Sequence, residues 1–201
     1  MDSKSTALVL IGYQNDYFAE DGVLHAVIEE STKTVLANTL AMIEALIDTD
    51  VLIVTTPIVF TPDYSELVDP IGILKIIKEA GAFRSRSTGV KTIPEILGFG
   101  DRIVEVPGKR GFDAFADTGL DNILKAHKIT DIAFAGAVTS ICIDSTGRAA
   151  FEKGYKVTQL SDCTSSRTTV EQAFYCSTVF PLYGAVMDSK EFIQDLVIEA
   201  S

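Results

Sequence analysis

One cysteine follows a glycine turn in a setting that suits nucleophilic chemistry. Residues 136–143 read Gly-Ala-Val-Thr-Ser-Ile-Cys-Ile, directly after the apolar run 132–135. This order predicts a strand, a tight turn and then a helix with Cys142 in its first turn. Free backbone N–H groups at such a turn stabilise both a thiolate and an oxyanion. Free cysteine is also often a buried packing residue. The sequence of residues 136–143 alone favours neither a nucleophile nor a packing residue at position 142.

Two further polar segments follow predicted strands. Residues 12–17 come after the apolar run 6–11, and residues 108–115 come after the short strand 102–106. The carboxyl ends of parallel strands share one edge of the sheet, where ligands bind. Asp16, Lys109 and Cys142 would converge there as a carboxylate, a cation and a thiol, the groups of a thiol hydrolase. Taken singly, Asp16 could be a turn residue, Lys109 a solvated surface charge and Cys142 a core residue.

The elements that must position these segments alternate along the chain. Strands are predicted over residues 6–11, 51–55, 102–106, 131–135, 156–160 and 185–188. Helices are predicted over residues 31–48, 71–80, 93–97, 120–127, 139–153 and 170–179, and from residue 189 onward. Strands separated by helices imply right-handed crossovers and a parallel sheet with helices on both faces. No linker or repeat interrupts the pattern, so a single domain over residues 1–201 is expected.

The composition indicates the class of protein and limits its possible partners. Hydrophobic residues make up 47% of the 201 residues, which indicates a globular chain. A net charge of −11 disfavours nucleic acid and anionic membranes as partners. The three cysteines form no CxxC motif and no even disulfide framework, and the apolar run near residue 7 is too short for a signal or membrane segment. We therefore expect a cytoplasmic protein with a small-molecule substrate.

The motifs, in this order, resemble the isochorismatase-like cysteine hydrolases, a superfamily that includes nicotinamidases, N-carbamoylsarcosine amidase and isochorismatase. Residues 7–17 are similar to its opening strand and Asp-x-Gln-Asn-Asp-Phe turn. Residues 109–120 resemble its Lys-x-x-x-Ser-Ala-Phe…Thr-x-Leu stretch, and residues 136–143 its Gly-x-x-Thr-x-x-Cys-Val turn. The resemblance covers nearly the whole chain. It implies a three-layer, Rossmann-like α/β sandwich with six parallel strands in the order 3-2-1-4-5-6, and a homo-oligomer.

The resemblance also implies a Cys-Asp-Lys mechanism on a small amide, carbamoyl or vinyl-ether substrate. Cys142 would attack the substrate, and Lys109 would stabilise charge. Backbone N–H groups of Val138 and Cys142 would hold the oxyanion, and the peptide bond between Ala137 and Val138 would be cis. The side chains of Tyr17, Phe60 and Phe112 are candidates for an apolar substrate pocket.

The chain departs from the family pattern at the aspartate, whose place is taken by Gly12. The register is fixed by residues 14–16, so glycine removes the proton acceptor of the triad. Asp16, Glu20, Asp21, His25 or a bound water are substitutes that the sequence leaves open. If the turn admits a side chain, Gly12→Asp should raise the rate. Two functions remain open: a hydrolase, and a catalytically impaired relative that binds a small carbonyl compound or serves as an oligomeric scaffold.

Cofactors have no support in the sequence. Residues 55–64, where nicotinamidases of this superfamily place metal ligands, contain no histidine. The chain's two histidines, His25 and His127, are far apart, so a metal site with nitrogen ligands is not expected. No glycine-rich phosphate-binding pattern follows a strand. We expect neither a metal nor an organic cofactor.

Overall fold

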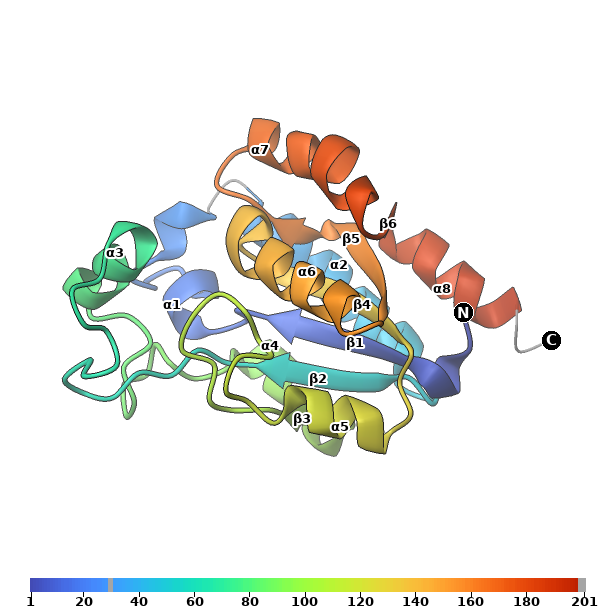
Figure 1. Ribbon diagram of the computed structural model, residues 1–201, viewed down its shortest axis with the longest axis horizontal. Coiled ribbons are helices and arrows are strands. Elements are labelled where there is room, and N and C mark those ends of the chain that lie inside the picture. The colour runs from blue at the N-terminus through green and yellow to red at the C-terminus, as the bar shows by residue number, and fades with distance from the viewer. Residues whose placement is uncertain (29–30, 199–201) are drawn as a thin grey trace.

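The computed structural model describes residues 1–28 and 31–198 and has one parallel sheet at its centre (Figure 1). Within these residues, six strands lie in the order β3-β2-β1-β4-β5-β6. The strands are β1 (Thr6–Ile11), β2 (Leu52–Thr56), β3 (Ile103–Glu105), β4 (Asp131–Ala137), β5 (Lys156–Ser165) and β6 (Ala185–Met187). The predicted doubly wound α/β fold and its strand order are confirmed.

Helices cover both faces of the sheet. The α-helices are α1 (Asn15–Phe18), α2 (Thr32–Leu46), α3 (Gly72–Ala80), α4 (Pro94–Leu97), α5 (Leu120–Ala126), α6 (Asp144–Glu152), α7 (Thr169–Phe174) and α8 (Ser189–Ile198). Short 3₁₀ turns are η1 (Ser3–Ser5), η2 (His25–Val27), η3 (Gly100–Arg102) and η6 (Phe180–Leu182), and π-helical turns are η4 (Thr139–Ile143) and η5 (Tyr175–Val179). Across the described ranges, no helix combines the length and apolar character needed to span a bilayer.

The central strands explain why the sequence adopts this fold. Every residue of β1 and of β4 is buried, as expected for strands covered on both faces, which carry continuous rather than alternating apolar runs. Helix α2 packs against α8 and β5 behind the sheet, and α6 lies in front of it (Figure 1). Because β1 and β4 are neighbours, the segments that follow them emerge side by side at one edge.

The structure differs from the predicted elements near that edge. Strand β5 continues to residue 165 instead of ending at 160, because β4 extends to Ala137 and pairs with it again beyond a register shift. The predicted helix 139–153 begins as the π-helical turn η4 and continues as α6. The predicted helix 170–179 likewise divides into α7 and η5. Single π-helical turns are frequently found at functional sites.

Candidate active site

Cys142 and Lys109 meet at the carboxyl edge of the sheet. Cys142 lies in η4, and 3% of its surface is exposed. Lys109 is fully buried, and its Nζ lies 3.4 Å from the Cys142 Sγ. The same ammonium donates to the carbonyl oxygen of Gly111. A buried cation beside a buried thiol is the electrostatic setting in which a sulfur anion is stabilised.

The backbone before Cys142 forms a tight turn. Gly136 has φ +125°, and a Cβ there would lie 1.8 Å from the carbonyl oxygen of Ile11 in the neighbouring strand, so glycine alone fits. The peptide bond between Ala137 and Val138 is cis, at the position that the resemblance implies. The Val138 carbonyl accepts hydrogen bonds from the N–H groups of two later turn residues, at 3.0 and 3.2 Å, which fixes the turn against η4.

A glutamine that the sequence analysis missed holds this turn from the side. The Thr139 hydroxyl donates to Gln172 Oε1 at 2.6 Å, and Thr139 is fully buried. The other end of the same amide donates to the Thr164 hydroxyl at 2.9 Å and to the Ser161 carbonyl at 3.1 Å. Gln172 therefore ties the nucleophile turn to both α7 and β5. No local sequence pattern around residue 172 could have indicated this role.

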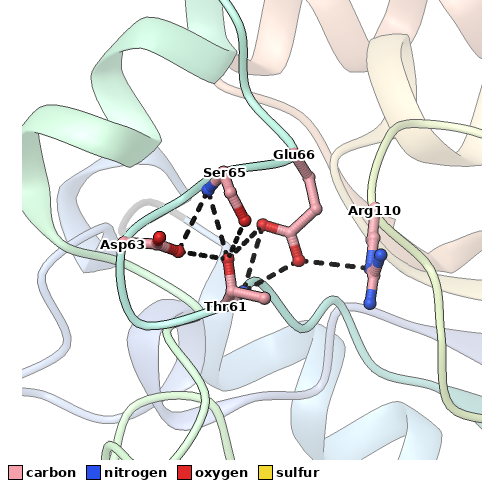
Figure 2. Close-up of polar contacts among 5 residues, drawn as sticks. All are labelled: Thr61, Asp63, Ser65, Glu66 and Arg110. Atoms are coloured by element: carbon pink, nitrogen blue, oxygen red, sulfur yellow. Dashed lines mark hydrogen bonds and ion pairs between the residues drawn. The ribbon is translucent and has the colours of Figure 1, made fainter.

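The loop that carries Lys109 is anchored on its outer side. The Val59 N–H donates to the Lys109 carbonyl at 3.1 Å, and Arg110 Nε lies 3.4 Å from Glu66 Oε1 (Figure 2). Lys109 and Arg110, adjacent in sequence, thus have different environments. Lys109 faces the thiol, whereas Arg110 is exposed and pairs with a carboxylate of the loop after β2. Their charges do not form one joint anion site.

Glu66 belongs to a hydrogen-bonded cluster that shapes the loop after β2 (Figure 2). The Thr61 hydroxyl lies 2.6 Å from Glu66 Oε2 and 2.8 Å from Asp63 Oδ1 and can donate its one proton to either, and the Ser65 N–H donates to Asp63 at 3.2 Å. Burial alone would raise the pKa of the Glu66 carboxyl, but the hydrogen bonds from Thr61 and the charge of Arg110 bring this pKa below its ordinary value. Glu66 therefore remains ionised at neutral pH and keeps the two loops joined.

The three predicted pocket residues surround Cys142. Tyr17, Phe60 and Phe112 line one small pocket with the thiol, and Phe112, 37% exposed, lies at its mouth. The remaining lining residues, which are not among the predicted ones, are Ile58, Ile73, Leu74, Ile77, Gly111 and Ile141. Three of them lie on one face of α3, at the i, i+1 and i+4 spacing of an amphipathic helix. This spacing can be read from the sequence and indicates that the three side chains share one face of a helix.

The Tyr17 hydroxyl is buried near Cys142. Its ring packs against Phe83 with centroids 5.1 Å apart, and 2% of the residue is exposed. Burial raises the pKa of the Tyr17 hydroxyl far above its ordinary value, and the nearby Cys142 and Asp16 raise it further. The hydroxyl therefore stays protonated at neutral pH.

Gly12 lies at the end of β1 in a conformation that excludes a side chain. Its φ is +77°, and a Cβ there would lie 2.7 Å from the carbonyl oxygen of Ala137. The ring of Tyr17 is 3.6 Å from the same position. The condition attached to the Gly12→Asp expectation, that the turn admit a side chain, is therefore not met on this backbone.

Three of the four side chains that could replace the missing aspartate have other partners. Asp16 Oδ2 accepts the Phe83 N–H at 2.6 Å, and burial raises the pKa of this carboxyl. The His25 ring contacts the Tyr17 carbonyl at 3.0 Å, and Glu20 lies 3.9 Å from Lys33 at the surface. Asp16 and Asp21 both line a separate cleft. In residues 1–28 and 31–198, no hydrogen bond or ion pair joins any of the four candidates to Cys142.

We expect Gly12→Asp to lower both stability and any activity. An L residue at this φ is strained by about 1–3 kcal/mol, and its Cβ would push against the Ala137 carbonyl beside the nucleophile. Thermal unfolding and turnover of Gly12→Asp should be compared with those of Gly12→Ala, which adds the same Cβ without charge. Equal losses in both variants identify backbone strain as the cause. A faster Gly12→Asp enzyme would contradict this reasoning.

No cluster of three or more histidine, cysteine, aspartate or glutamate side chains occurs in the described part of the chain.

Comparisons with known proteins identify a family for this chain. A family model described as the isochorismatase domain matches residues 6–191. A ureidoacrylate amidohydrolase of Cronobacter sakazakii is 25% identical over an alignment that covers 98% of this chain and 90% of that protein. An uncharacterized isochorismatase family protein of Bacillus subtilis is 32% identical over 44% of this chain, and the alignment spans about half, 47%, of that relative's length.

The fold recurs in solved structures. The crystal structure of a cysteine hydrolase from Pseudomonas syringae pv. phaseolicola superposes with a TM-score of 0.86 at 19% sequence identity, over 98% of this chain and 95% of that one. An isochorismatase family protein from Burkholderia thailandensis superposes with a TM-score of 0.76 at 26% identity, over 96% of each chain.

Proposed function

The chain belongs to the isochorismatase family, and from this premise we propose that it is a cysteine-dependent hydrolase of a small amide in the cytoplasm. The observation that carries the proposal is the buried contact of 3.4 Å between Lys109 Nζ and Cys142 Sγ, next to an apolar pocket. The name of the Cronobacter sakazakii relative, an amidohydrolase, supports amides over vinyl ethers. No metal or organic cofactor enters the proposed reaction.

The first half-reaction forms a thioester. The Cys142 thiolate attacks the amide carbon, a C–S bond forms, and the carbonyl π electrons move to oxygen. Backbone N–H groups of Val138 and Cys142 stabilise this oxyanion. The oxyanion pair then re-forms the carbonyl, the C–N bond breaks with its electrons on nitrogen, and the Lys109 ammonium gives its proton to the leaving nitrogen. With glycine at position 12, Lys109 replaces the missing carboxylate as the proton carrier.

The second half-reaction regenerates the enzyme. The neutral Lys109 amine takes a proton from water while the water oxygen attacks the thioester carbon. The C–S bond then breaks, the carboxylic acid leaves, and Cys142 returns to the thiolate beside the Lys109 ammonium. Tyr17 keeps its proton throughout, because its pKa is raised, and offers a hydrogen bond at the pocket wall.

The order of cysteine alkylation tests the nucleophile. We expect iodoacetamide to modify Cys142 first, because burial and the neighbouring Asp162 raise the pKa of Cys163 to about 12, and burial raises the pKa of Cys176. Modification of each thiol should be followed against pH by peptide mass spectrometry. Earlier modification of Cys163 or Cys176 would remove Cys142 from the proposed role.

A catalytically impaired binding protein or oligomeric scaffold is the second candidate, and Gly12 is the observation that favours it. Ammonia release from acetamide, propionamide and butyramide distinguishes a hydrolase from this alternative. Turnover that disappears after alkylation of Cys142 supports the hydrolase. Binding of an amide without turnover, measured by calorimetry, supports the alternative.

We also propose that the protein is a homo-oligomer. The segment between β2 and β3 exposes large apolar side chains, with Val68 82% exposed, Ile71 84% and Ile76 51%. Exposed apolar residues grouped in this way often mark an interface. Light scattering at micromolar concentration should give a mass that is a multiple of 21.7 kDa. A monomeric mass would contradict the proposal.

A further inference from the structure

A second cavity lies beside the helix that follows β5. Helix α7 and the turn η5 form one wall, and Ser31, the end of β5 and the residues just after it form the rest. Its volume is about 290 Å³, close to the lower limit of the roughly 300–1,000 Å³ typical of pockets for small molecules. Cys142 and Lys109 lie outside its wall, so the proposed hydrolysis makes no use of this space.

The wall of this cavity is polar and lacks charge. Six of its nine lining residues are serine or threonine, and the other three are Gln172, Ala173 and Cys176. Among the described residues that line it, no side chain is acidic or basic. An ionised ligand would lose hydration here without gaining an opposite charge, which is strongly unfavourable. The cavity therefore suits an uncharged molecule.

Two hydroxyl groups of the wall have protons to donate. Ser166 is 5% exposed, and its buried oxygen has no hydrogen-bond partner in the described part of the chain. Because no hydrogen bond fixes its χ1 angle, this hydroxyl is free to turn toward the cavity. The Thr168 oxygen accepts the Glu171 N–H at 3.1 Å and gives its own proton to none of the described residues. A buried hydroxyl without a partner is typical of a place where a bound molecule completes the hydrogen bonding.

The amide of Gln172, by contrast, has no proton left to donate. Its nitrogen donates to the Ser161 carbonyl at 3.1 Å and to the Thr164 hydroxyl at 2.9 Å. The unused donors of the wall are therefore hydroxyl protons, and their matching partner is an uncharged acceptor oxygen such as a carbonyl. The side-chain methyl groups of the threonines and Ala173 leave apolar surface for the body of such a molecule.

Gln172 links this cavity to the nucleophile turn. Its Oε1 accepts the Thr139 hydroxyl at 2.6 Å, while the same side chain forms part of the cavity wall. Thr139 and Cys142 belong to the same turn, η4. Because Cys142 is 3% exposed, a reagent reaches its sulfur only when this turn opens. A molecule in the cavity restrains Gln172 and, through Thr139, this opening.

We propose that the cavity is an effector site for a compact, uncharged carbonyl compound. The carbonyl oxygen accepts protons from Ser166 and Thr168, and the apolar body lies against Ala173 and Cys176. Occupancy holds the nucleophile turn closed through Gln172. This site is separate from the pocket beside Cys142, and binding to it involves no hydrolysis.

Two probes of equal size test the ligand class. Acetophenone carries a neutral carbonyl on a phenyl ring, and benzoate has the same number of heavy atoms but is charged. Modification of Cys176 by iodoacetamide, followed by peptide mass spectrometry at alkaline pH, reports occupancy because Cys176 lines the cavity. We expect about 10 mM acetophenone to slow this modification about threefold or more, and benzoate at the same concentration to slow it less than about 1.5-fold.

The modification rate of Cys142 in the same samples tests the coupling. We expect it to fall about twofold or more, with the same dependence on acetophenone concentration as the rate of Cys176. If acetophenone slows the modification of Cys142 alone, it binds in the other pocket and the effector site is overturned. If it protects Cys176 and leaves Cys142 unchanged, the coupling through Gln172 is overturned.

Ser166→Ala tests the proposed hydrogen bond. Protection of Cys176 should then require about three- to tenfold more acetophenone, because the variant lacks one donor. The matched control is Ser177→Ala, which removes an exposed hydroxyl next to Cys176 and outside the cavity wall. It should require the wild-type concentration. Equal shifts in both variants would exclude Ser166 as the donor, and the two-probe comparison on the wild-type protein decides the ligand class even if Ser166→Ala fails to fold.

The outcomes separate this inference from the proposed hydrolase function. Equal protection by both probes, or protection by neither, overturns the effector site and leaves the roles of Lys109 and Cys142 untouched. A protein that hydrolyses no amide but whose Cys176 and Cys142 are both protected by acetophenone loses the hydrolase function and keeps the effector site. Selective protection by acetophenone that Ser166→Ala weakens and Ser177→Ala preserves supports the site.

Discussion

Replacing Cys142 with alanine is expected to abolish amide turnover, with a loss of at least about a thousandfold. The variant keeps Lys109, the cis turn and the pocket but lacks the atom that forms the thioester. Cys142 is buried and small, so the change removes one sulfur atom, and Lys109 keeps its hydrogen bond to the Gly111 carbonyl. Ammonia release from butyramide, together with thermal unfolding, measures both properties.

Cys176→Ser is the matched control for this prediction. Cys176 is half-buried in η5, and its sulfur lies 3.5 Å from Gln172 Nε2, a contact that a serine hydroxyl can also make. We expect less than about a threefold change in its rate, since Cys176 does not line the pocket with Cys142. A Cys142→Ala protein that still hydrolyses butyramide at the wild-type rate would refute the proposed mechanism.

Lys109→Met is expected to lower kcat by about 10²- to 10⁴-fold while the protein remains folded. Methionine has nearly the length of lysine, so it fills the buried site, but it removes both the charge beside Cys142 and the proton carrier. Lys109→Met leaves the Cys142 sulfur and the Gly111 carbonyl without their donor, so the melting temperature should also fall. Activity measured well below that temperature separates the chemical loss from the loss of stability.

Arg110→Gln provides the neighbouring control. Arg110 is exposed and interacts with Glu66, and surface ion pairs contribute about 0–1 kcal/mol. We expect its turnover to remain within about threefold of the wild-type value. If Lys109→Met and Arg110→Gln lose the same activity, the effect comes from the loop and Lys109 has no distinct chemical role. If Lys109→Met unfolds, its role is structural.

The strand pattern could be predicted because it depends on local apolar runs. The run over residues 6–11 is buried on both faces of β1, and the glycine turn before Cys142 follows the strand as predicted. The convergence of Lys109 and Cys142 also followed from topology, because parallel strands end at one edge. Asp16, the third predicted group, lies in a different cleft, since its carboxylate is held by the Phe83 N–H.

The features that were missed depend on tertiary contacts. The hydrogen bond between Gln172 and Thr139 joins α7 to η4. The residues next to Gln172 in the sequence do not indicate this role. The sequence predicts a helix over residues 71–80, but the position of its inner face over Cys142 depends on how the loop after β2 folds back. The extension of β5 to Ser165 required the re-pairing with β4 beyond the register shift.

The conformation of Gly12 also has an evolutionary consequence. Its left-handed backbone and the close Ala137 carbonyl mean that an aspartate codon at this position would disturb the turn before it supplied a proton acceptor. A side chain at position 12 therefore requires the neighbouring turn to change as well. The residues tolerated at position 12 are coupled in this way to the conformation of the nucleophile turn.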